Sequence, residues 1–355
     1  MSIETRRLSV ALAGAIAVIS VLLAIAPTAF AAEPIVRVKR LLDRPIIGPD
    51  LHPSIGENIQ GPSVIRVPDW VEGRLGSYYL YFADHKGRHI RMAYADRVTG
   101  PWSIHPPGSL QIEDSGFLTE SPEVTPEQVA ELEARRSGVG ISHDLLKEIT
   151  TPHIASPDVH VDSARRRIVM YFHGLEGVGI QASRVATSRN GIDFKAQPQV
   201  LGRTYMRIFH HHDMTYSLAM PGQLYRSRDG FTDFEKGAML FNPNMRHSAL
   251  LKRGDTLWVF WTEAGTAPEA IRLSSIDLSG DWLDWKETEP IEVLRPEHDW
   301  EGADAPVVPS MRSTAYGHVN QLRDPAILED DGRVYLLYAV AGESGIALAE
   351  VFLEE

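Results

Sequence analysis

Five short runs of aromatic and β-branched residues recur along the chain, and each run ends near a glycine. Such runs have the composition of buried strands. A second strand-like stretch precedes each run, and turn residues such as those at 253–255 and 330–332 join the two into a hairpin. The runs cover 78–82, 168–172, 215–219, 257–261 and 334–338, and the preceding stretches cover 62–66, 157–161, 205–209, 247–251 and 325–328.

The repeat continues beyond each hairpin. A third strand follows each run, for example at 90–94 and 271–275, and glycine turns at 190–191 and 229–230 lead to a fourth. Five units of up to four antiparallel strands, packed face to face around an axis, are typical of a propeller. The pattern therefore predicts an all-β fold, a five-bladed β-propeller.

Two intervals between the runs are long and hold insertions. The first predicts a short helix, with Thr125 as N-cap, Pro126 as its first residue, Gln128 completing a capping box and Gly138 after its end. Long insertions on a regular scaffold often carry binding residues, although they can also simply cover blade edges. The second insertion, 281–320, is predicted to stack tryptophans on a ligand, and it contains Trp282, Trp285 and Trp300.

The N-terminus has the order of features found in a secretory signal peptide. Arg6 and Arg7 precede an apolar run at 8–26, and small residues at 29 and 31 form a cleavage site. We therefore expect residues 1–31 to be a signal peptide and 32–355 to form a single propeller domain that is secreted or periplasmic, without a membrane partner once the signal is removed. An uncleaved anchor and a twin-arginine export route both remain open.

Charge and cysteine content narrow the function further. Removal of 1–31 takes away Glu4, Arg6 and Arg7, a net charge of +1, and so changes the formal net charge from −12 to −13. An acidic chain is poorly suited to neutralising phosphates, which argues against nucleic acid as a partner. The chain has no cysteine, which excludes thiol catalysis and Cys-ligated zinc.

Polar residues cluster where a propeller places its mouth. The start of each inner strand and the end of the next strand lie on the same face of the disc, and both faces of an inner strand are buried, so an unpaired charge there is costly. We expect these side chains to share one cavity. They are Asn58, Gln60, His153, Ser156, Asp158, Arg207, Arg246, His247, Arg323 and Asp324 from inner-strand starts, and Asp84, His85, His173, Glu263 and Glu343 from second-strand ends.

Carboxylates, imidazoles and guanidiniums around one cavity favour a site that cleaves or binds sugars. Acid and base catalysis needs two carboxyl groups whose environments push their pKa values apart, and Asp158, Asp324 and Glu263 are the catalytic candidates. The arginines are suited to sugar hydroxyls or an anionic sugar group. The residues expected to bind substrate are Gln60, His85, His153, His173, Arg207, Arg246, His247, Arg323 and Trp300. The alternative is structural: Asp324 caps its turn or pairs with Arg323, and Asp158 joins two blades.

The fourteen histidines fall into two groups. His210, His211 and His212 are predicted to lie at a hairpin on the rim, away from the mouth. No close ligand spacing supports a metal site, so no cofactor is predicted. The alternative is a divalent metal held by the mouth histidines His85, His153, His173 and His247.

Three motifs resemble five-bladed glycoside hydrolases, namely glycoside hydrolase family 43 and its furanosidase relatives. They are Gly-Pro-Ser-Val-Ile at 61–65, Ser-Pro-Asp-Val at 156–159 and Arg-Asp-Pro-Ala-Ile at 323–327. The resemblance extends over residues 32–355 and implies a carbohydrate substrate and catalysis by carboxylates at the propeller mouth.

The chain departs from that family at its acids. The family's first aspartate precedes a proline where this chain has Gly61, and its second where this chain has Ser156. Its third acid has no counterpart near 205–207, and only Asp324-Pro325 reproduces the local pattern, in a different blade. Two other functions therefore stay open. One is a polysaccharide lyase that uses histidine or tyrosine with arginine on a uronic acid, and the other is a sugar-binding propeller without activity.

Overall fold

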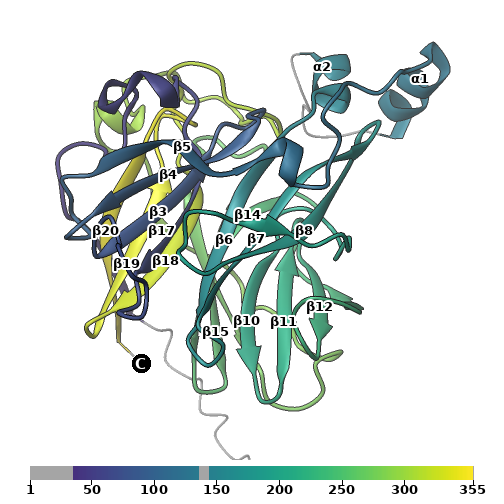
Figure 1. Cartoon of the computed structure of the whole chain (residues 1–355). Coiled ribbons are helices and arrows are strands. Elements are labelled where there is room, and N and C mark those ends of the chain that lie inside the picture. The colour runs from purple at the N-terminus through teal and green to yellow at the C-terminus, as the bar shows by residue number, and fades with distance from the viewer. Residues whose placement is uncertain (1–34, 136–143, 355) are drawn as a thin grey trace, which may run out of the picture.

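A computed structural model describes residues 35–135 and 144–354 (Figure 1). The predicted signal peptide and Gly138 lie outside these ranges. Five four-stranded antiparallel sheets surround a common axis, so the predicted five-bladed β-propeller is confirmed. No helix within the two ranges combines the length and the apolar character that crossing a membrane requires.

Each blade is a sheet whose first strand lies nearest the axis. The inner strands are β2 (Gln60–Arg66), β6 (Ile154–Asp162), β10 (Arg207–His211), β14 (Met245–Arg253) and β18 (Arg323–Asp330). The second strands are β3 (Tyr78–Ala83), β7 (Arg167–Gly177), β11 (Met214–Ala219), β15 (Thr256–Glu263) and β19 (Arg333–Ala339). The third and fourth strands are β4 (His89–Ala95) with β5 (Ser103–Gln111), β8 (Ile180–Ser188) with β9 (Lys195–Ala196), β12 (Gln223–Ser227) with β13 (Glu235–Met239), and β16 (Ile271–Asp277) with β17 (Ile291–Leu294).

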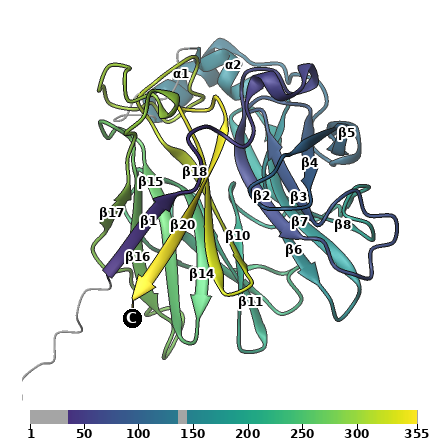
Figure 2. The same ribbon diagram turned by 90° about the vertical axis from the view of Figure 1, so that its left-hand side faces the viewer.

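The fifth blade is built from both ends of the chain. Its third strand is β20 (Ile346–Glu354), and its outer strand is β1 (Ile35–Arg40), which pairs antiparallel with β20 from Ile35 opposite Glu354 to Arg40 opposite Ala349. Figure 2 shows the two strands side by side next to the C-terminus. The sequence analysis assigned no strand to 35–40.

The blades pack on one another through side chains of both faces of each sheet. Tyr81 of β3 and Tyr171 of β7 make equivalent contacts, because each hydroxyl donates to a turn carbonyl of the next blade: Gly191 O at 2.7 Å and Gly230 O at 2.9 Å. Both glycines have positive φ, and an added Cβ would lie about 3 Å from the tyrosine oxygen. These turns therefore require glycine, which explains their recurrence in the sequence.

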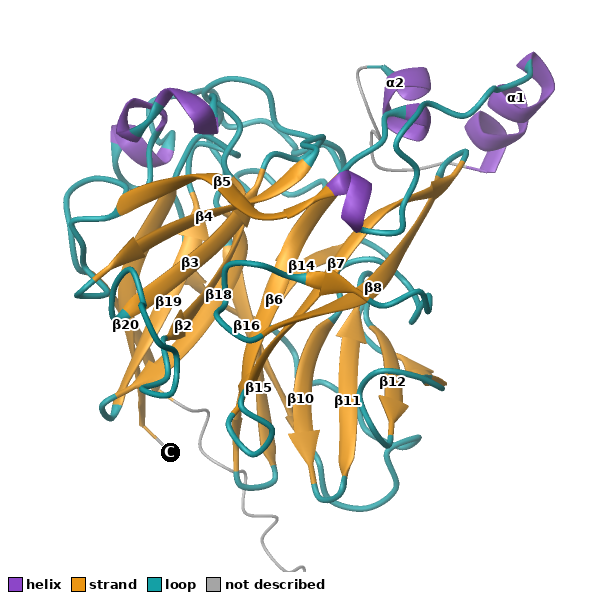
Figure 3. Cartoon of the chain, viewed as in Figure 1, coloured by secondary structure: helices purple, strands orange, loops and turns teal. Residues whose placement is uncertain are grey.

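The first insertion carries two helices above one side of the propeller (Figure 3). Helix α1 (Pro126–Arg135) has the predicted capping box, with Thr125 N and Gln128 N bonded to the other residue's side chain at 2.9 and 3.3 Å. Helix α2 (Leu145–Thr150) was not predicted. The tip of the β7–β8 hairpin holds α2 in place, because Gly179 N donates to Ile149 O at 2.9 Å. Single-turn 3₁₀ helices lie at Pro49–Leu51, Pro53–Ile55, Ile112–Asp114 and Asp299–Glu301.

The second insertion is mostly structural. Trp282 and Trp285 are buried, and they pack on Phe209 and Tyr216 between the third and fourth blades. The prediction that these two tryptophans stack on a ligand is wrong. Their indole rings are part of the core between these two blades.

Candidate functional site

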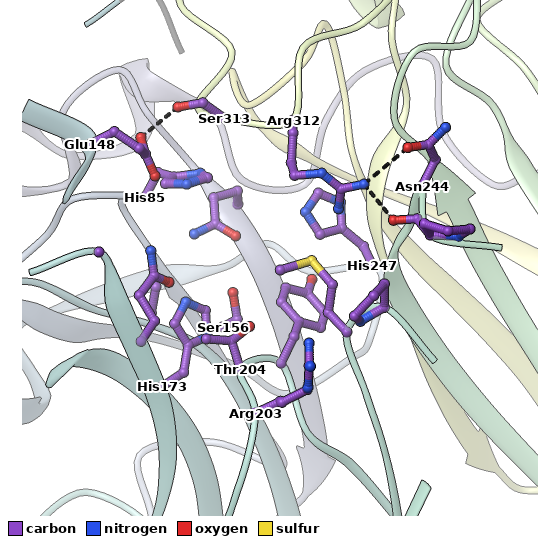
Figure 4. Close-up of a pocket in the computed structure, with 18 residues that line it drawn as sticks. His85, Glu148, Ser156, His173, Arg203, Thr204, Asn244, His247, Arg312 and Ser313 are labelled. Carbon is purple, nitrogen blue, oxygen red and sulfur yellow. Dashed lines mark hydrogen bonds between the residues drawn. The ribbon is translucent and has the colours of Figure 1, made fainter. Parts of the chain in front are cut away.

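The mouth of the propeller is hollowed by a cavity of about 510 Å³ (Figure 4). Residues from the inner strands of several blades, from α2 and from both insertions surround it. The lining residues are Gln60, His85, Glu148, Ala155, Ser156, His173, Gly179, Gln181, Arg203, Thr204, Tyr205, Met220, Pro221, Pro243, Asn244, His247, Arg312 and Ser313.

A backbone irregularity at the start of the inner strands brings side chains to this cavity. The strand register shifts at the start of β2, β6, β14 and β18, and Gly61, Ser156, Tyr205 and Asp324 all have positive φ. Bulges of this kind re-aim side chains beside binding sites. A Cβ at Gly61 would lie 3.0 Å from Ser156 Cα. A side chain at position 61 would therefore need the left-handed backbone and a small displacement of Ser156.

Asp324 lies beneath the floor of the cavity. Its carboxylate accepts a short hydrogen bond from the hydroxyl of Tyr205, and His247 Nε2 lies 3.5 Å from the same oxygen. The second oxygen, Oδ2, is buried and has no partner among the described residues. Burial, together with repulsion from Glu343, raises the pKa of Asp324 to about 6. Tyr205 and His247 line the cavity, so they connect Asp324 to it.

Glu343 is also a carboxylate near the cavity, but unlike Asp324 it has several hydrogen-bond donors and a lowered pKa. Its oxygens accept from Arg323 Nη1 at 2.7 Å, Asn58 Nδ2 at 2.8 Å and the Ala315 amide at 3.2 Å, and they lie 3.2 Å from His85 Nδ1. Burial alone would raise the pKa of Glu343, but His85 and Arg323 hold it well below its usual range. Because Glu343 is ionised and can only accept, His85 carries its proton on Nδ1 in the neutral form, which leaves Nε2 as a base.

Glu148 of α2 is a carboxylate that lines the cavity. It pairs with Lys86 Nζ at 2.9 Å and accepts from Ser313 Oγ at 2.6 Å. Burial opposes ionisation, but Lys86 and His85 lower the pKa of Glu148 to about 2. Sequence reasoning missed Glu148. The available signal was Asp144 as an N-cap ahead of apolar residues at 145, 146 and 149, and Asp144 does accept from Lys147 N at 3.0 Å.

Two of the predicted mouth arginines are buried and committed to other protein groups. Arg323 donates to Glu343, Gln321 and backbone carbonyls, and Arg246 donates to Met311 O at 2.7 Å. Both lie near Glu269 Oε2, at 3.6 and 3.5 Å. Burial and the charge of Arg323 lower the pKa of Arg246 to about 10. The two guanidiniums therefore balance buried carboxylates and do not line the cavity.

The mouth histidines lie together, as expected, but at different depths. His85, His173 and His247 line the cavity, and His153 packs edge-on against His173 with ring centroids 6.1 Å apart. Burial lowers the pKa of His153 to about 3, and burial with neighbouring His153 and His85 lowers that of His173 well below its usual range. Both rings are therefore neutral near pH 7. Among the residues placed by the structure, no group of three or more His, Asp or Glu could hold a metal.

Asp158 and Arg207 lie deeper on the axis. They line a separate cavity of about 100 Å³, formed by later residues of the inner strands. Asp158 Oδ2 accepts from Ile208 N at 2.8 Å and lies 2.7 Å from His160 Nε2, and Arg207 donates to Pro157 O at 2.7 Å and Ser248 O at 2.9 Å. The structure thus separates Asp158 from the mouth. The reason is the bulge, which turns Ser156, not Asp158, into the main cavity.

Of the other predicted residues, some line the cavity and some lie elsewhere. Gln60 lines the cavity, whereas Glu263 does not and instead pairs with Arg272 at 2.7 Å. Trp300 stacks on His298, with ring centroids 5.5 Å apart, and packs against the fifth blade, away from the cavity. His210–His212 lie at the β10–β11 hairpin, as the sequence indicated.

The chain is similar in sequence to the uncharacterised protein R118 of Acanthamoeba polyphaga mimivirus. The two are 35% identical over 321 residues, which cover 83% of each chain. No protein-family model matches the chain.

Two solved structures with the same fold are glycoside hydrolases. One is a GH43 β-xylosidase/α-arabinofuranosidase from a compost microbial metagenome, in complex with xylotriose: TM-score 0.52, 11% identity, covering 90% of this chain and 95% of that one. Another is an endo-1,4-β-xylanase from Bacteroides thetaiotaomicron: TM-score 0.52, 12% identity, covering 84% and 95%. At this identity the likeness shows the fold, and function has to be argued from the site.

Proposed function

This chain belongs to the same family as the mimivirus protein R118, and from the geometry of its mouth we propose that it is a glycoside hydrolase-like enzyme acting on an extracellular oligo- or polysaccharide. The name of R118 does not state an activity, so the proposal rests on the residues of the mouth cavity. The observation that carries it is the hydrogen bond between the cavity-lining Tyr205 and the buried Asp324, whose pKa is raised to about 6.

Asp324 supplies the acid through Tyr205. When Asp324 is protonated, it donates to the Tyr205 oxygen and frees the tyrosine proton to point into the cavity. The tyrosine proton then moves to the leaving glycosidic oxygen as the bond to the anomeric carbon breaks, and the proton of Asp324 replaces it on Tyr205. A carboxyl group with a pKa near the working pH is suited to this role.

Glu148 is the second carboxylate of the proposed reaction. Its low pKa, about 2, keeps it ionised. In the cavity Glu148 accepts a proton from the attacking water, whose oxygen bonds to the anomeric carbon. Lys86 stabilises the negative charge of Glu148. Of the three catalytic candidates chosen from sequence, this assignment retains Asp324. Asp158 and Glu263 do not line the cavity.

A screen of plant and algal polysaccharides tests the proposal. The wild-type protein should release new reducing ends from at least one of them without an increase in ultraviolet absorbance. Asp324→Asn should lose this activity and stay folded, as judged by circular dichroism. Full activity in a folded Asp324→Asn protein would show that the assignment is wrong.

A polysaccharide lyase is the second candidate, and His85 is the observation that favours it. Glu343 fixes the proton of His85 on Nδ1, and His85 lines the cavity, so Nε2 could remove the proton beside a uronic acid carboxylate. The same screen decides between the two candidates, because a lyase produces an unsaturated sugar that absorbs ultraviolet light.

Action outside the cytoplasm is part of the proposal and rests on the predicted signal peptide at 1–31. Expression of the full chain in a bacterial host, followed by fractionation and intact-mass measurement, tests it. We expect a periplasmic or secreted protein that begins at Ala32. A full-length protein in the membrane fraction would favour the uncleaved anchor.

A further inference from the structure

The cavity is positively charged, although the chain has a formal net charge of −12. Arg203 and Arg312 contribute guanidiniums to its lining, and Glu148 is the one carboxylate there, among the residues the structure describes. Lys86, 2.9 Å from Glu148, compensates that carboxylate. The balance of full charges around the hollow is therefore positive, opposite in sign to the protein as a whole.

Arg203 has a fixed backbone and an uncommitted side chain. Its N–H donates to the Tyr225 hydroxyl at 3.3 Å, and its carbonyl accepts from Ser183 Oγ at 2.7 Å, so the segment between the second and third blades is anchored. The guanidinium is exposed and makes no hydrogen bond to any residue of 35–135 or 144–354. Its five N–H donors are available to a ligand.

Arg312 comes from the second insertion. Its Nη2 donates to Pro243 O at 2.7 Å and Asn244 Oδ1 at 3.3 Å, which fixes the plane of the guanidinium at the cavity wall. Figure 4 shows both arginines around the space that the lining residues enclose. A guanidinium held in a fixed orientation is suited to a carboxylate or sulfate, since its donors form a planar fork.

Burial and other cations near the cavity shift the pKa values of two of its lining residues. Burial lowers the pKa of His247 well below its usual range, and Arg246 and Arg323 lower it further. Burial would raise the pKa of Glu148, but Lys86 and His85 bring it down to about 2. These cations lie around the cavity in addition to Arg203 and Arg312, so the ionised Glu148 does not make the balance of charge negative.

We propose that the sugar bound in this cavity carries an anionic group, a uronic acid carboxylate or a sulfate ester, which Arg203 and Arg312 bind. The inference deepens the proposed function and rests on it for the site's being a sugar site. It transfers the role of binding an anion from Arg207, Arg246 and Arg323, which do not line the cavity, to Arg203 and Arg312, which do.

Binding measured by NMR or calorimetry on inactive Asp324→Asn tests the inference without relying on turnover. The probes are glucuronate, galacturonate and galactose 6-sulfate, each compared with glucose or galactose. We expect at least one anionic sugar to bind about tenfold or more tightly than its neutral parent. The carboxylate and sulfate probes then distinguish the two sources of charge.

Substitutions of Arg203 and Arg312 test whether these two residues cause the preference for an anionic sugar. Arg203→Gln and Arg312→Gln should each reduce the preference for the anionic sugar, and the double variant should abolish it. Arg253→Gln is the matched control, because Arg253 pairs with Glu329 at a hairpin away from the cavity and should leave the preference unchanged.

Two results overturn the inference: no anionic sugar binds more tightly than its neutral parent, or the preference persists in the folded double variant. Neither result concerns catalysis. If the wild-type enzyme cleaves neutral glycans and shows no preference for anions, the proposed function stands and this inference fails. If anionic sugars bind through the two arginines but no glycan yields product, the inference stands and the enzyme assignment fails.

Discussion

The two cavities on the propeller axis contain the same kinds of side chain and use them differently. Around the smaller one, Asp158 has both His160 and the Ile208 amide within 2.8 Å, and His160 and Arg207 keep its pKa below the usual range despite burial. At the mouth, Asp324 has one oxygen without a partner, a raised pKa, and about five times the cavity volume above it.

This difference separates a structural carboxylate from a candidate catalytic one. At Asp158 protein groups compensate the charge, because Oδ2 contacts His160 and the Ile208 amide and Oδ1 lies 3.9 Å from Arg207 Nη1. Asp324 differs, because it is buried, one of its oxygens is unbonded, its pKa is raised and it is connected to the main cavity. These features are expected of a functional group. The comparison predicts opposite effects for matching substitutions at the two aspartates.

The largest expected difference is in turnover. Asp324→Asn should lower kcat by about 10²- to 10⁴-fold, because it removes the proton donor. Asp158→Asn should stay within about threefold of wild type, because Asp158 does not reach the main cavity. Both are assayed on the substrate found by the polysaccharide screen. A large loss in Asp158→Asn alone would reverse the roles that the structure assigns.

Tyr205 provides a second test of the mouth. Tyr205→Phe should reduce kcat by about 10- to 100-fold, because the proton relay is broken. It should also shift the alkaline limb of the pH–rate profile to higher pH, since the Tyr205 hydroxyl lowers the pKa of Asp324 and its loss keeps that acid protonated to higher pH. Tyr81→Phe is the control, because that hydroxyl also donates from a buried ring, but to Gly191 O between blades. Equal losses in the two variants would indicate a packing effect.

Stability should depend on pH in opposite directions at the two sites. The pKa of Asp324 is raised from 3.8 to about 6, so its ionisation costs stability as pH rises through this window. Asp324→Asn should therefore be more stable than wild type above pH 6, by an amount on the order of 3 kcal/mol at most. The gain should vanish below pH 3.8. Denaturant unfolding at pH 3.5 and pH 7 measures it, and an equal gain at both values would exclude a charge effect.

Asp158→Asn should destabilise the fold by about 1–3 kcal/mol through the lost pairing with His160 and the Ile208 amide. The pKa of Asp158 is lowered and that of His160 is raised, so both are charged from below pH 3.8 to above pH 6.5. The loss should therefore be greatest near pH 5, diminishing in acid as Asp158 protonates and at higher pH as His160 deprotonates. Thermal unfolding across this range is the measurement, and a loss that does not vary with pH would contradict it.

The fold was predictable from sequence because its signals are local and repeated. Apolar strand pairs, glycine turns such as those at 191 and 230, and the capping box at 125–128 each act over a few residues. Strand β1 was missed because its partner β20 lies at the other end of the chain. A six-residue strand that completes a distant sheet has no hairpin signal of its own.

The site was predictable in outline but not residue by residue. Inner-strand starts do reach the mouth, yet a bulge of one residue decides whether Ser156 or Asp158 faces it. Arg203 and Arg312 lie in irregular segments with no periodic pattern to place them. The tight packing at position 61, where an added Cβ would lie 3.0 Å from Ser156 Cα, is a contact between blades and has no local sequence signal.

The pairing of β1 with β20 has a consequence for the order of assembly. The first four blades are each made from consecutive residues, so they can form by local folding while the chain is still being released. The fifth blade cannot form in this way, because its strands β1 and β20 are separated by nearly the whole length of the chain. Contacts between such distant segments form late and slowly. Arg323 and Asp324 belong to that last blade. Until the circle closes, β20 presents an open edge to other chains, and the acid of the proposed reaction is not yet fixed.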